Sequence, residues 1–472
     1  MASTTAILED DEPRQKRSDD LTSGLVHKRL FGLWLPMIGG ILAVKSIGLS
    51  DAYFISQLGE GPLAAVSFTF PIVMILISLA VGLSAGASSI LSRRIGADKS
   101  DEEKQAIVAG NLSLAVGLAV LLGGLGALLI NPVLQLMGAS GETLKDASLY
   151  MYIWFAGAVF LIIPIVANGI LRATGDGVSP AVLMTGVALL NIGLNPLFIF
   201  GVGVLPELGM HGAAVATVLA RGVATLCACA LLFHKNLFNM RLHIVKRGLA
   251  DWKEIVRIGL PASLSTSVNP MALSIATAAV ATLGQSEVAA FGVATKIQSI
   301  AIVPLLALSS ASSPFAGQNS GAGLTDRSRT MLYWCAGISV CWATLAAGVF
   351  WLLGGTLAEV FVSSDRGIEV LTLYLAIVPI SYLGYGIVIS LSAALNGIGK
   401  SLKALIAAAG RALALLAPAA WIGVSVAGFA GLAWGFLTAN LLSGALALLG
   451  MKYLSLSEAG QSGHSDESEA DG

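Results

Sequence analysis

The sequence predicts an all-α polytopic membrane protein in which twelve transmembrane helices form two six-helix lobes related by an internal parallel repeat. Three observations support this prediction. The 472 residues are 56% hydrophobic and only 12% charged, with a mean hydropathy of +0.82. Apolar stretches of roughly 20 residues, long enough to span a bilayer as helices, recur along the chain. The two halves of the chain also share short motifs in the same order.

Each predicted span is an apolar stretch that can satisfy its own backbone hydrogen bonds as a helix. In chain order the spans are 31–53, 63–91, 106–130, 147–171, 179–201, 210–233, 256–283, 288–314, 330–355, 369–395, 401–424 and 427–452. Twelve spans with short connections leave no room for a sizeable soluble domain.

The polar segments predict the domain organisation. Residues 1–30 and the acidic residues 453–472 are expected to be disordered tails, because they contain too few apolar residues to be buried. Between them we expect an N-lobe at 31–233, a basic cytoplasmic linker at 234–255 and a C-lobe at 256–452. No cleavable signal is expected, since the first segment has no apolar core.

The distribution of basic residues predicts the orientation. With the N-terminus in the cytoplasm, 21 of the 27 Lys and Arg residues fall in cytoplasmic tails and loops, and only Lys145 and Arg366 fall in loops on the other side. This asymmetry follows the positive-inside rule. We therefore expect a multi-pass protein of the inner or plasma membrane with both termini in the cytoplasm.

An internal repeat appears when the chain is aligned with itself. The matches lie at an offset of 225 for 58–67 with 283–292 and for 88–101 with 313–326, at 224 for 171–176 with 395–400, and at 219 for 209–214 with 428–433. The offset covers six predicted helices, an even number, so the two copies cross the membrane in the same direction. Two such bundles meeting at a central cleft are typical of alternating-access transporters.

Composition and motifs exclude several functions. A net charge of −1 without a basic, aromatic-interleaved stretch argues against nucleic-acid binding. The P-loop pattern GxxxxGK[ST] is absent, so the chain cannot use ATP by itself. No nucleophile has a paired base, and the four cysteines lie in apolar stretches without His or acids beside them. We expect no enzyme activity, no cofactor and no metal site.

Asp51 is the acid that lies well inside a predicted span, and a charge at the bilayer centre costs roughly 2.5–3.5 kcal/mol on insertion scales. Such an acid is retained where it pairs, lines a wet cavity or takes up protons. One alternative is a fixed ion pair with Lys45, although six helical residues place the two side chains roughly 120° apart. The other is a proton-carrying carboxyl.

Other polar residues within the spans allow two interpretations each. Asn191 and Asn195 lie on one helix face and could bind a cation, water or substrate, or could join helices by hydrogen bonds. Lys296 and Arg411 have no acid beside them in sequence, and they are expected to snorkel or to cap carbonyls. Prolines inside several spans permit bends, some of them hinges.

Several motifs resemble multidrug and toxic compound extrusion (MATE) transporters of the DinF-like branch. They are LSDAYFISQLGEGPLAAVSFTFPI, GLSAGASSILSRRIGA, NGILRATGD, LNIGLNPLFIFGVG, GMHGAAVAT, KIQSIAIVPLLALSSASSPFAGQNSGAG and LNGIGK, spread over roughly residues 30–450. The resemblance implies twelve helices in two lobes, alternating access, and export of organic compounds driven by inward flow of protons or sodium.

The resemblance also implies roles for particular residues. The ion-coupling residues carried over by motif are Asp51, Asn191, Asn195 and Thr217. Pro36 matches a proline whose bend is proposed to follow protonation. For substrate binding the candidates are Asn168, which matches a position lining the first-lobe cavity, together with Asn191, Asn195 and Lys45.

Two departures from the family pattern favour protons over sodium. The family pattern LNxxLDP has an acid where this chain has Asn195, and Asn269 stands where a second-lobe sodium site has glutamate. Asp51 is then the only carboxylate of the first-lobe site, which suits one proton better than a sodium cage. The missing acid and the nearby Lys45 also allow a substrate that is neutral, zwitterionic or anionic.

Together these observations predict a secondary antiporter that exports organic, drug-like compounds in exchange for protons, with Asp51 as the coupling carboxylate. A lipid-linked precursor flippase of the same superfamily and a sodium-coupled exporter are the alternatives. A channel subunit or inert scaffold is disfavoured by the repeat. The expected partners are a small organic substrate, the proton and the bilayer, and the protein is expected to act as a monomer.

Overall fold

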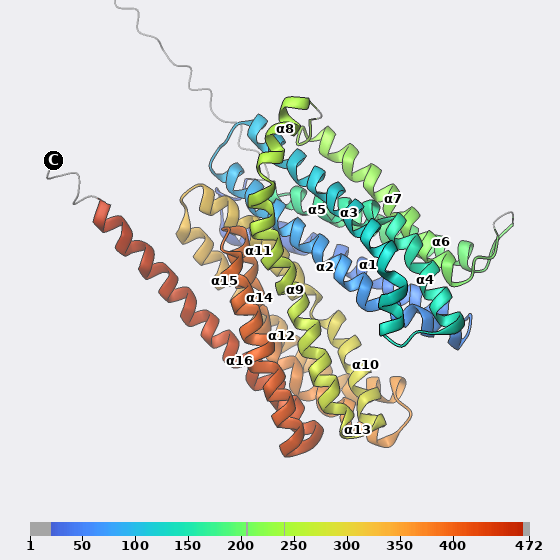
Figure 1. Ribbon diagram of the computed structural model, residues 1–472. Helices are drawn as coiled ribbons and strands as arrows, with labels where there is room; N and C mark the ends of the chain where they lie inside the picture. Colours follow the sequence, from blue (N-terminus) through green and yellow to red (C-terminus); the bar gives the residue numbers. More distant parts are fainter. Residues whose placement is uncertain (1–19, 204–205, 240, 466–472) are drawn as a thin grey trace, which may run out of the picture.

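The computed structural model describes residues 20–203, 206–239 and 241–465, and throughout these ranges the ordered elements are helices (Figure 1). The N-lobe comprises α1 (Val26–Ser56), α2 (Glu60–Gly96), α3 (Asp101–Leu136), α4 (Gly141–Ala156), α5 (Ala158–Ala173), α6 (Val178–Ile199) and α7 (Met210–His234). The short helix α8 (Leu242–Ala250) lies in the linker. The C-lobe comprises α9 (Trp252–Ala281), α10 (Gln285–Ala301), α11 (Val303–Gly321), α12 (Thr325–Phe361), α13 (Asp365–Ile377), a 3₁₀ turn (Val378–Ser381), α14 (Tyr382–Gly397), α15 (Ser401–Ala409), a π-helical turn (Gly410–Leu416) and α16 (Ala417–Ser465).

These helices account for the twelve predicted spans. In the described ranges, nine helical stretches are long and apolar enough to cross a membrane, and two bent pairs, α4 with α5 and α10 with α11, raise the number to eleven. The last of the nine, Ser401–Met451, is interrupted by non-helical backbone at Ala427 and Gly428. Gly423 and Gly431 approach each other across this break, so the chain reverses there and the stretch contains two spans.

The two copies of the repeat share an unusual turn. Gly209 has φ +54° and ψ −138°, and Gly428, 219 residues later, has φ +58° and ψ −140°. This region of backbone space is open essentially only to glycine. Each turn lets the returning helix pack closely on the previous one: a Cβ on Gly212 would lie 2.2 Å from the carbonyl oxygen of Phe198, and one on Gly431 would lie 1.9 Å from that of Gly423. The sequence repeat is therefore a structural repeat.

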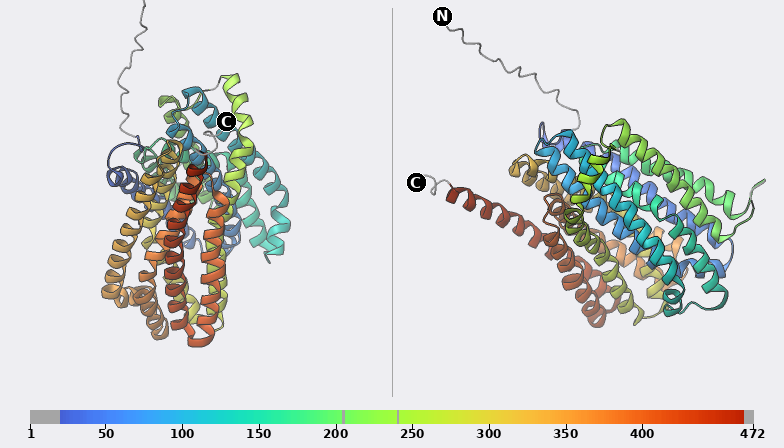
Figure 2. Two further views of the ribbon diagram at one scale, coloured as in Figure 1. Left: turned by 90° about the vertical axis from the view of Figure 1, so that its left-hand side faces the viewer. Right: turned by 45° about the horizontal axis from the view of Figure 1, so that its top comes forward.

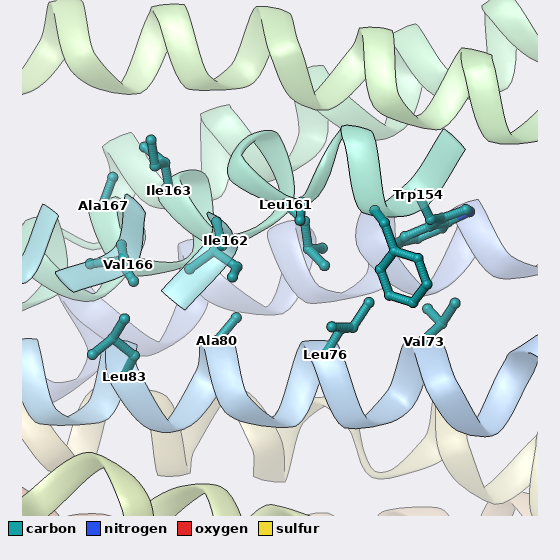
Figure 3. Close-up of a cluster of buried hydrophobic side chains, with 14 of the residues drawn as sticks. Val73, Leu76, Ala80, Leu83, Trp154, Leu161, Ile162, Ile163, Val166 and Ala167 are labelled. Atoms are coloured by element: carbon teal, nitrogen blue, oxygen red, sulfur yellow. The ribbon is translucent and has the colours of Figure 1, made fainter. Parts of the chain in front are cut away.

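Each lobe has its own hydrophobic core. In the N-lobe, buried residues of α2, including Val73, Leu76, Ala80 and Leu83, face Trp154 of α4 and the apolar side chains of α5 (Figure 3). The α2 residues recur every three or four positions and so form one face of the helix. A separate cluster, which includes Phe291, Tyr374 and Phe436, fills the C-lobe. The two main cores are separate, and a smaller cluster packs α1 of the N-lobe against α11 and α12 of the C-lobe.

The lobes meet at the end of the molecule where α2 and α11 terminate and α8 lies, which we call the basic end (Figure 1). The contact is reciprocal at two residues of the repeat, Gly96 and Gly321. A Cβ on Gly96 would lie 1.9 Å from the carbonyl oxygen of Gln318, and one on Gly321 would lie 2.1 Å from that of Arg93. Gln318 and Arg93 are also 225 residues apart, so a pseudo-twofold axis passes through this crossing.

Hydrogen bonds join the lobes near the same end. Ser89 Oγ donates to the carbonyl oxygen of Gly397 at 3.0 Å, and Gln318 Nε2 donates to that of Ala173 at 2.8 Å. Closer to the middle of the molecule, α2 lies against α9, where Gly82 and Gly86 leave no space for a side chain. The lobes diverge from the basic end toward the opposite end (Figure 1).

The described part of the predicted N-terminal tail is ordered, which corrects that prediction for residues 20–30. The Leu21 N–H donates to Gln318 Oε1 at 3.1 Å, and Asn319 Nδ2 donates to the Leu21 carbonyl at 3.1 Å. Arg327 donates to the carbonyl oxygens of Leu21, Ser23 and Gly24. We call residues 20–25 the N-terminal strap, because they precede α1 of the N-lobe but bind the C-lobe.

The predicted tail boundaries differ in two further ways. Helix α1 begins at Val26, and α16 continues to Ser465, so residues 453–465 are helical where a disordered tail was expected. Extending an existing helix fixes one residue for each new backbone hydrogen bond, which favours continuation. The last turns of α16 project beyond the other helices (Figure 2). Residues 1–19 and 466–472 of the predicted tails lie outside the described residues.

Candidate functional site

The four predicted ion-coupling residues lie together in the N-lobe. Asn195 Nδ2 donates to Asp51 Oδ1 at 2.6 Å and lies 3.4 Å from Asn191 Oδ1, and Asn191 Nδ2 donates to Thr217 Oγ1 at 3.0 Å. Both asparagines and the threonine are at most 2% exposed, and Asp51 is partly buried. We call Asp51, Asn195, Asn191 and Thr217 the Asp51 cluster. It joins α1, α6 and α7 through side chains alone.

Small residues allow these helices to pack closely enough for the cluster to form. A Cβ on Gly40 of α1 would lie 2.9 Å from the Ala181 Cα of α6, and one on Gly177, which precedes α6, would lie 2.8 Å from the Leu33 Cα. Close approach of backbones at small residues is the usual means of helix association in membranes. It brings Asp51, near the other end of α1, within reach of the α6 amides.

The Asp51 cluster contains one ionisable group. Its other members offer amide and hydroxyl groups, which orient a carboxyl but cannot themselves exchange protons at physiological pH. Asn195 Oδ1 is buried and has no hydrogen-bond partner among the described residues. A protonated Asp51 carboxyl has an O–H that needs an acceptor, and an amide oxygen can provide it. The cluster can therefore hold Asp51 both as a carboxylate and as a neutral acid.

The alternative of a fixed Lys45–Asp51 ion pair is wrong. Among the described residues, no ion pair involves Lys45, which instead lines the cavity described below. The helical separation of about 120° expected from their spacing accounts for this divergence.

Arg221 is a residue of this region that the sequence analysis did not connect to Asp51. It lies one turn after Thr217 on α7, and its guanidinium is 5.6 Å from the centre of the Trp154 ring. The spacing of four residues from Thr217 is the sequence signal that could have identified it.

A cavity of about 830 Å³ lies between the lobes. Four basic residues line it: Lys45 and Arg172 of the N-lobe and Lys296 and Arg411 of the C-lobe. No Asp or Glu is among the described residues that line it, and most of its other polar residues are Ser, Thr, Asn and Gln. The cavity is therefore a cationic compartment lined by residues of both lobes, with no acid among its described lining residues.

Arg411 neither snorkels nor caps a carbonyl, contrary to the expectation from sequence. It is 5% exposed, and its guanidinium donates from Nη2 to Asn269 Oδ1 at 2.6 Å and from Nη1 to Asn440 Oδ1 at 3.0 Å. The same guanidinium lies 4.8 Å from the centre of the Tyr385 ring. These partners come from α9, α16 and α14, so Arg411 is held at the centre of the C-lobe.

Of the four substrate-binding candidates predicted from sequence, the structure places one in the wall of the cavity. Lys45 lines the cavity, whereas Asn168, Asn191 and Asn195 are not among its described lining residues. Asn168 is partly buried on α5, and its Oδ1 has no hydrogen-bond partner in the described ranges. The predicted hinge Pro36 lies inside α1, which runs as a single helix from Val26 to Ser56.

Comparison with known proteins agrees with this architecture. The MatE family model matches residues 36–197 and 261–422, two ranges separated by the same 225 residues as the internal repeat. The chain is 35% identical over 425 residues to the FAD transporter of Shewanella oneidensis, and the match covers 90% of this chain and 94% of that protein.

Two solved structures share the fold closely. One is a mutant of the Vibrio cholerae MATE transporter VcmN, with a TM-score of 0.86 and 30% identity over 92% of this chain and 97% of that one. The other is a MOP superfamily transporter from Pyrococcus furiosus, with a TM-score of 0.84 and 29% identity over 92% and 96% of the two chains. The binding pocket of the second is described as having reverse polarity that suggests a different function.

Proposed function

This chain belongs to the MatE family of membrane transporters, and we propose that it is a proton-coupled antiporter that exports an organic anion by alternating access. Family members are transporters and not enzymes. The cavity supports the substrate class, and the Asp51 cluster supports the coupling ion.

The observation that carries the substrate class is the acid-free, cationic cavity. Its four basic side chains favour phosphate or carboxylate groups and repel organic cations. A volume of about 830 Å³ is within the range of pockets for drug-sized ligands. The relative named FAD transporter suggests one candidate, a flavin dinucleotide with two phosphates. Of the substrate charges left open by the sequence, we therefore choose the anionic one.

The coupling ion is proposed from the Asp51 cluster. One carboxylate with two amides and a hydroxyl can load and release a single proton. Sodium prefers several oxygen ligands, and here Asn195 presents its amide nitrogen to Asp51 rather than an oxygen. Proton coupling through Asp51 is therefore our proposal, with sodium coupling as its alternative.

A lipid-linked precursor flippase would also use a cationic cavity. The likeness to the protein named FAD transporter favours an organic anion that is not linked to a lipid. A flippase activity would appear as substrate-dependent movement of a lipid anchor rather than of a free anion.

The conformation fits one half of an alternating-access cycle. By the positive-inside rule, we propose that the basic end faces the cytoplasm and that both described ends of the chain lie there. With the lobes in contact at this end, the cavity is closed toward the cytoplasm. Separating α2 from α11 at the Gly96–Gly321 crossing would open it to that side.

The purified transporter should be stabilised by anions and not by organic cations. We expect FAD at a concentration of 100 times its Kd to stabilise the folded protein by about 2.7 kcal/mol, which raises its Tm measurably. Ethidium at the same concentration should leave the Tm unchanged. The matching transport measurement is the uptake of FAD into inside-out vesicles whose lumen is more acidic than the medium. Stabilisation by ethidium and not by FAD would contradict the proposed substrate class.

A further inference from the structure

Arg411 is a buried cation without an acidic partner. Among the described residues it forms no ion pair, and its partners are two neutral amides and an aromatic ring. A buried charge that is not balanced by an opposite charge destabilises the folded protein, even when hydrogen bonds are made. At the same time Arg411 lines the cavity. A ligand with negative charge would supply the balance that the protein itself omits.

The local backbone holds Arg411 in an unusual setting. Residues Gly410–Leu416 form a π-helical turn between α15 and α16. Such turns are rare and occur frequently at functional sites, because the extra residue changes where a side chain points. Here the turn directs the guanidinium to Asn269 on α9 and Asn440 on α16. Sequence reasoning from an ideal helix could not place it.

The internal repeat gives this arrangement a counterpart in the N-lobe. At the offset of 219 that relates α7 to the second span of α16, Asn440 corresponds to Arg221. Arg221 lies one turn after Thr217 of the Asp51 cluster, whereas Asn440 binds the guanidinium of Arg411. Beside these equivalent positions the N-lobe therefore has the partly buried carboxylate of Asp51, and the C-lobe has the buried guanidinium of Arg411. A carboxylate can take up and release a proton, and a guanidinium can bind an anion.

We propose that Arg411, with Asn269 and Tyr385, forms the anchoring site for a phosphoryl group of the exported anion. This rests on the proposed function, and it assigns the anion and the proton to different lobes. The guanidinium has five N–H donors in a planar fork that matches phosphoryl oxygens. The amide oxygens of Asn269 and Asn440 accept hydrogen bonds from the guanidinium, and phosphoryl oxygens could accept the same bonds in their place. Asn269 and Tyr385 line the same cavity as Arg411.

Lys296 strengthens the site, because it belongs to the same lobe, lines the same cavity and is exposed to it. Charge-assisted hydrogen bonds to a phosphoryl group are stronger than those between neutral groups. A ligand without phosphate would keep the apolar and hydroxyl contacts of the cavity and lose the contact with Arg411. Discrimination between phosphorylated and unphosphorylated forms of one ligand is therefore the property that Arg411 should control.

The test measures how the purified, full-length transporter binds FAD and riboflavin, which share the flavin ring but differ in phosphate. The wild type should bind FAD more tightly than riboflavin. Arg411→Gln should weaken FAD binding by about 10- to 100-fold, the range expected for lost charge-assisted hydrogen bonds. Its riboflavin binding should change by less than about threefold. Lys403→Gln removes the same charge from an exposed position on α15 and should match the wild type.

Arg411→Lys provides the second variant, because it keeps the charge and loses the planar fork. It should bind FAD with an affinity between those of the wild type and Arg411→Gln, and it decides the question if the glutamine variant does not fold. Equal weakening of FAD and riboflavin by Arg411→Lys would overturn the anchoring site in favour of a structural role. Unchanged FAD binding in Arg411→Gln would overturn it while leaving the proposed function intact. A wild type that binds neither FAD nor inorganic pyrophosphate would contradict the proposed function itself.

Discussion

Asp51→Asn should reduce proton-driven accumulation of substrate to the level of vesicles without the transporter. The amide is nearly the same size as the carboxyl and can keep a hydrogen bond with Asn195, but it cannot exchange a proton. The structure of the Asp51 cluster should therefore survive while its coupling is lost. The measurement is substrate uptake into inside-out proteoliposomes, with the lumen either more acidic than the medium or at the same pH.

Substrate exchange separates this result from simple inactivation. With substrate on both sides and no pH gradient, Asp51→Asn should still exchange labelled for unlabelled substrate, because the cavity does not contain Asp51. Asp101→Asn is the matched control, since Asp101 is 74% exposed and its surface pair with Lys104 contributes little. Full pH-driven accumulation by Asp51→Asn would exclude proton coupling through this residue. Accumulation that follows a sodium gradient in the wild type would favour the sodium alternative.

Valine at Gly96 should prevent the lobes from closing at the basic end and should abolish transport. Its Cβ would lie 1.9 Å from the carbonyl oxygen of Gln318, far inside van der Waals contact, and this obstacle is backbone that cannot move aside. Gly321→Val should act in the same way, because its Cβ would lie 2.1 Å from the Arg93 carbonyl oxygen. Both substitutions obstruct the closed state and leave an open basic end unhindered.

Spin labels at Asp101 and Asp326 report on this closure, since both positions are exposed and correspond in the repeat. Pulsed electron–electron double resonance (DEER) should give a longer distance between the two labels in Gly96→Val than in the wild type. Gly124→Val is the control, because among the described residues nothing beyond the backbone of its own helix lies within 4 Å of a Cβ at Gly124. Distances and transport rates equal to those of the wild type would show that the crossing is not required for closure.

The fold was largely predictable from local patterns, whereas the members of the Asp51 cluster were predicted as a set only through the resemblance to MATE transporters. Apolar length gave the spans, the motif offsets gave the repeat, and the spacing of Asn191 and Asn195 placed them on one face of α6. The separation of Lys45 from Asp51 also followed from helical geometry. The spans, the repeat and these two placements need only the helical period and the order of the helices.

The cationic cavity was not predictable, because its basic residues come from distant parts of the chain. Arg172 was counted among the cytoplasmic loop residues, whereas the structure places it in the cavity wall with Lys296 and Arg411. The direction of Arg411 depends on a π-helical turn that leaves no clear mark in composition. The N-terminal strap was not predicted, because Gln318, Asn319 and Arg327 bind its backbone N–H and C=O groups. Every sequence has these groups, so no pattern of side chains marks the strap.

The four basic residues of the cavity, which has no Asp or Glu among its described lining residues, also bear on how the membrane voltage acts on the proposed transport cycle. If a substrate with two negative charges leaves while one proton enters, three elementary charges move in the direction that an inside-negative voltage favours. At 100 mV each charge contributes about 2.3 kcal/mol, so voltage alone would drive the cycle with about 7 kcal/mol. Such a pump would remain active in a cell whose exterior is no more acidic than its cytoplasm. A monovalent organic cation exported for one proton would gain nothing from the same voltage, because no net charge would move.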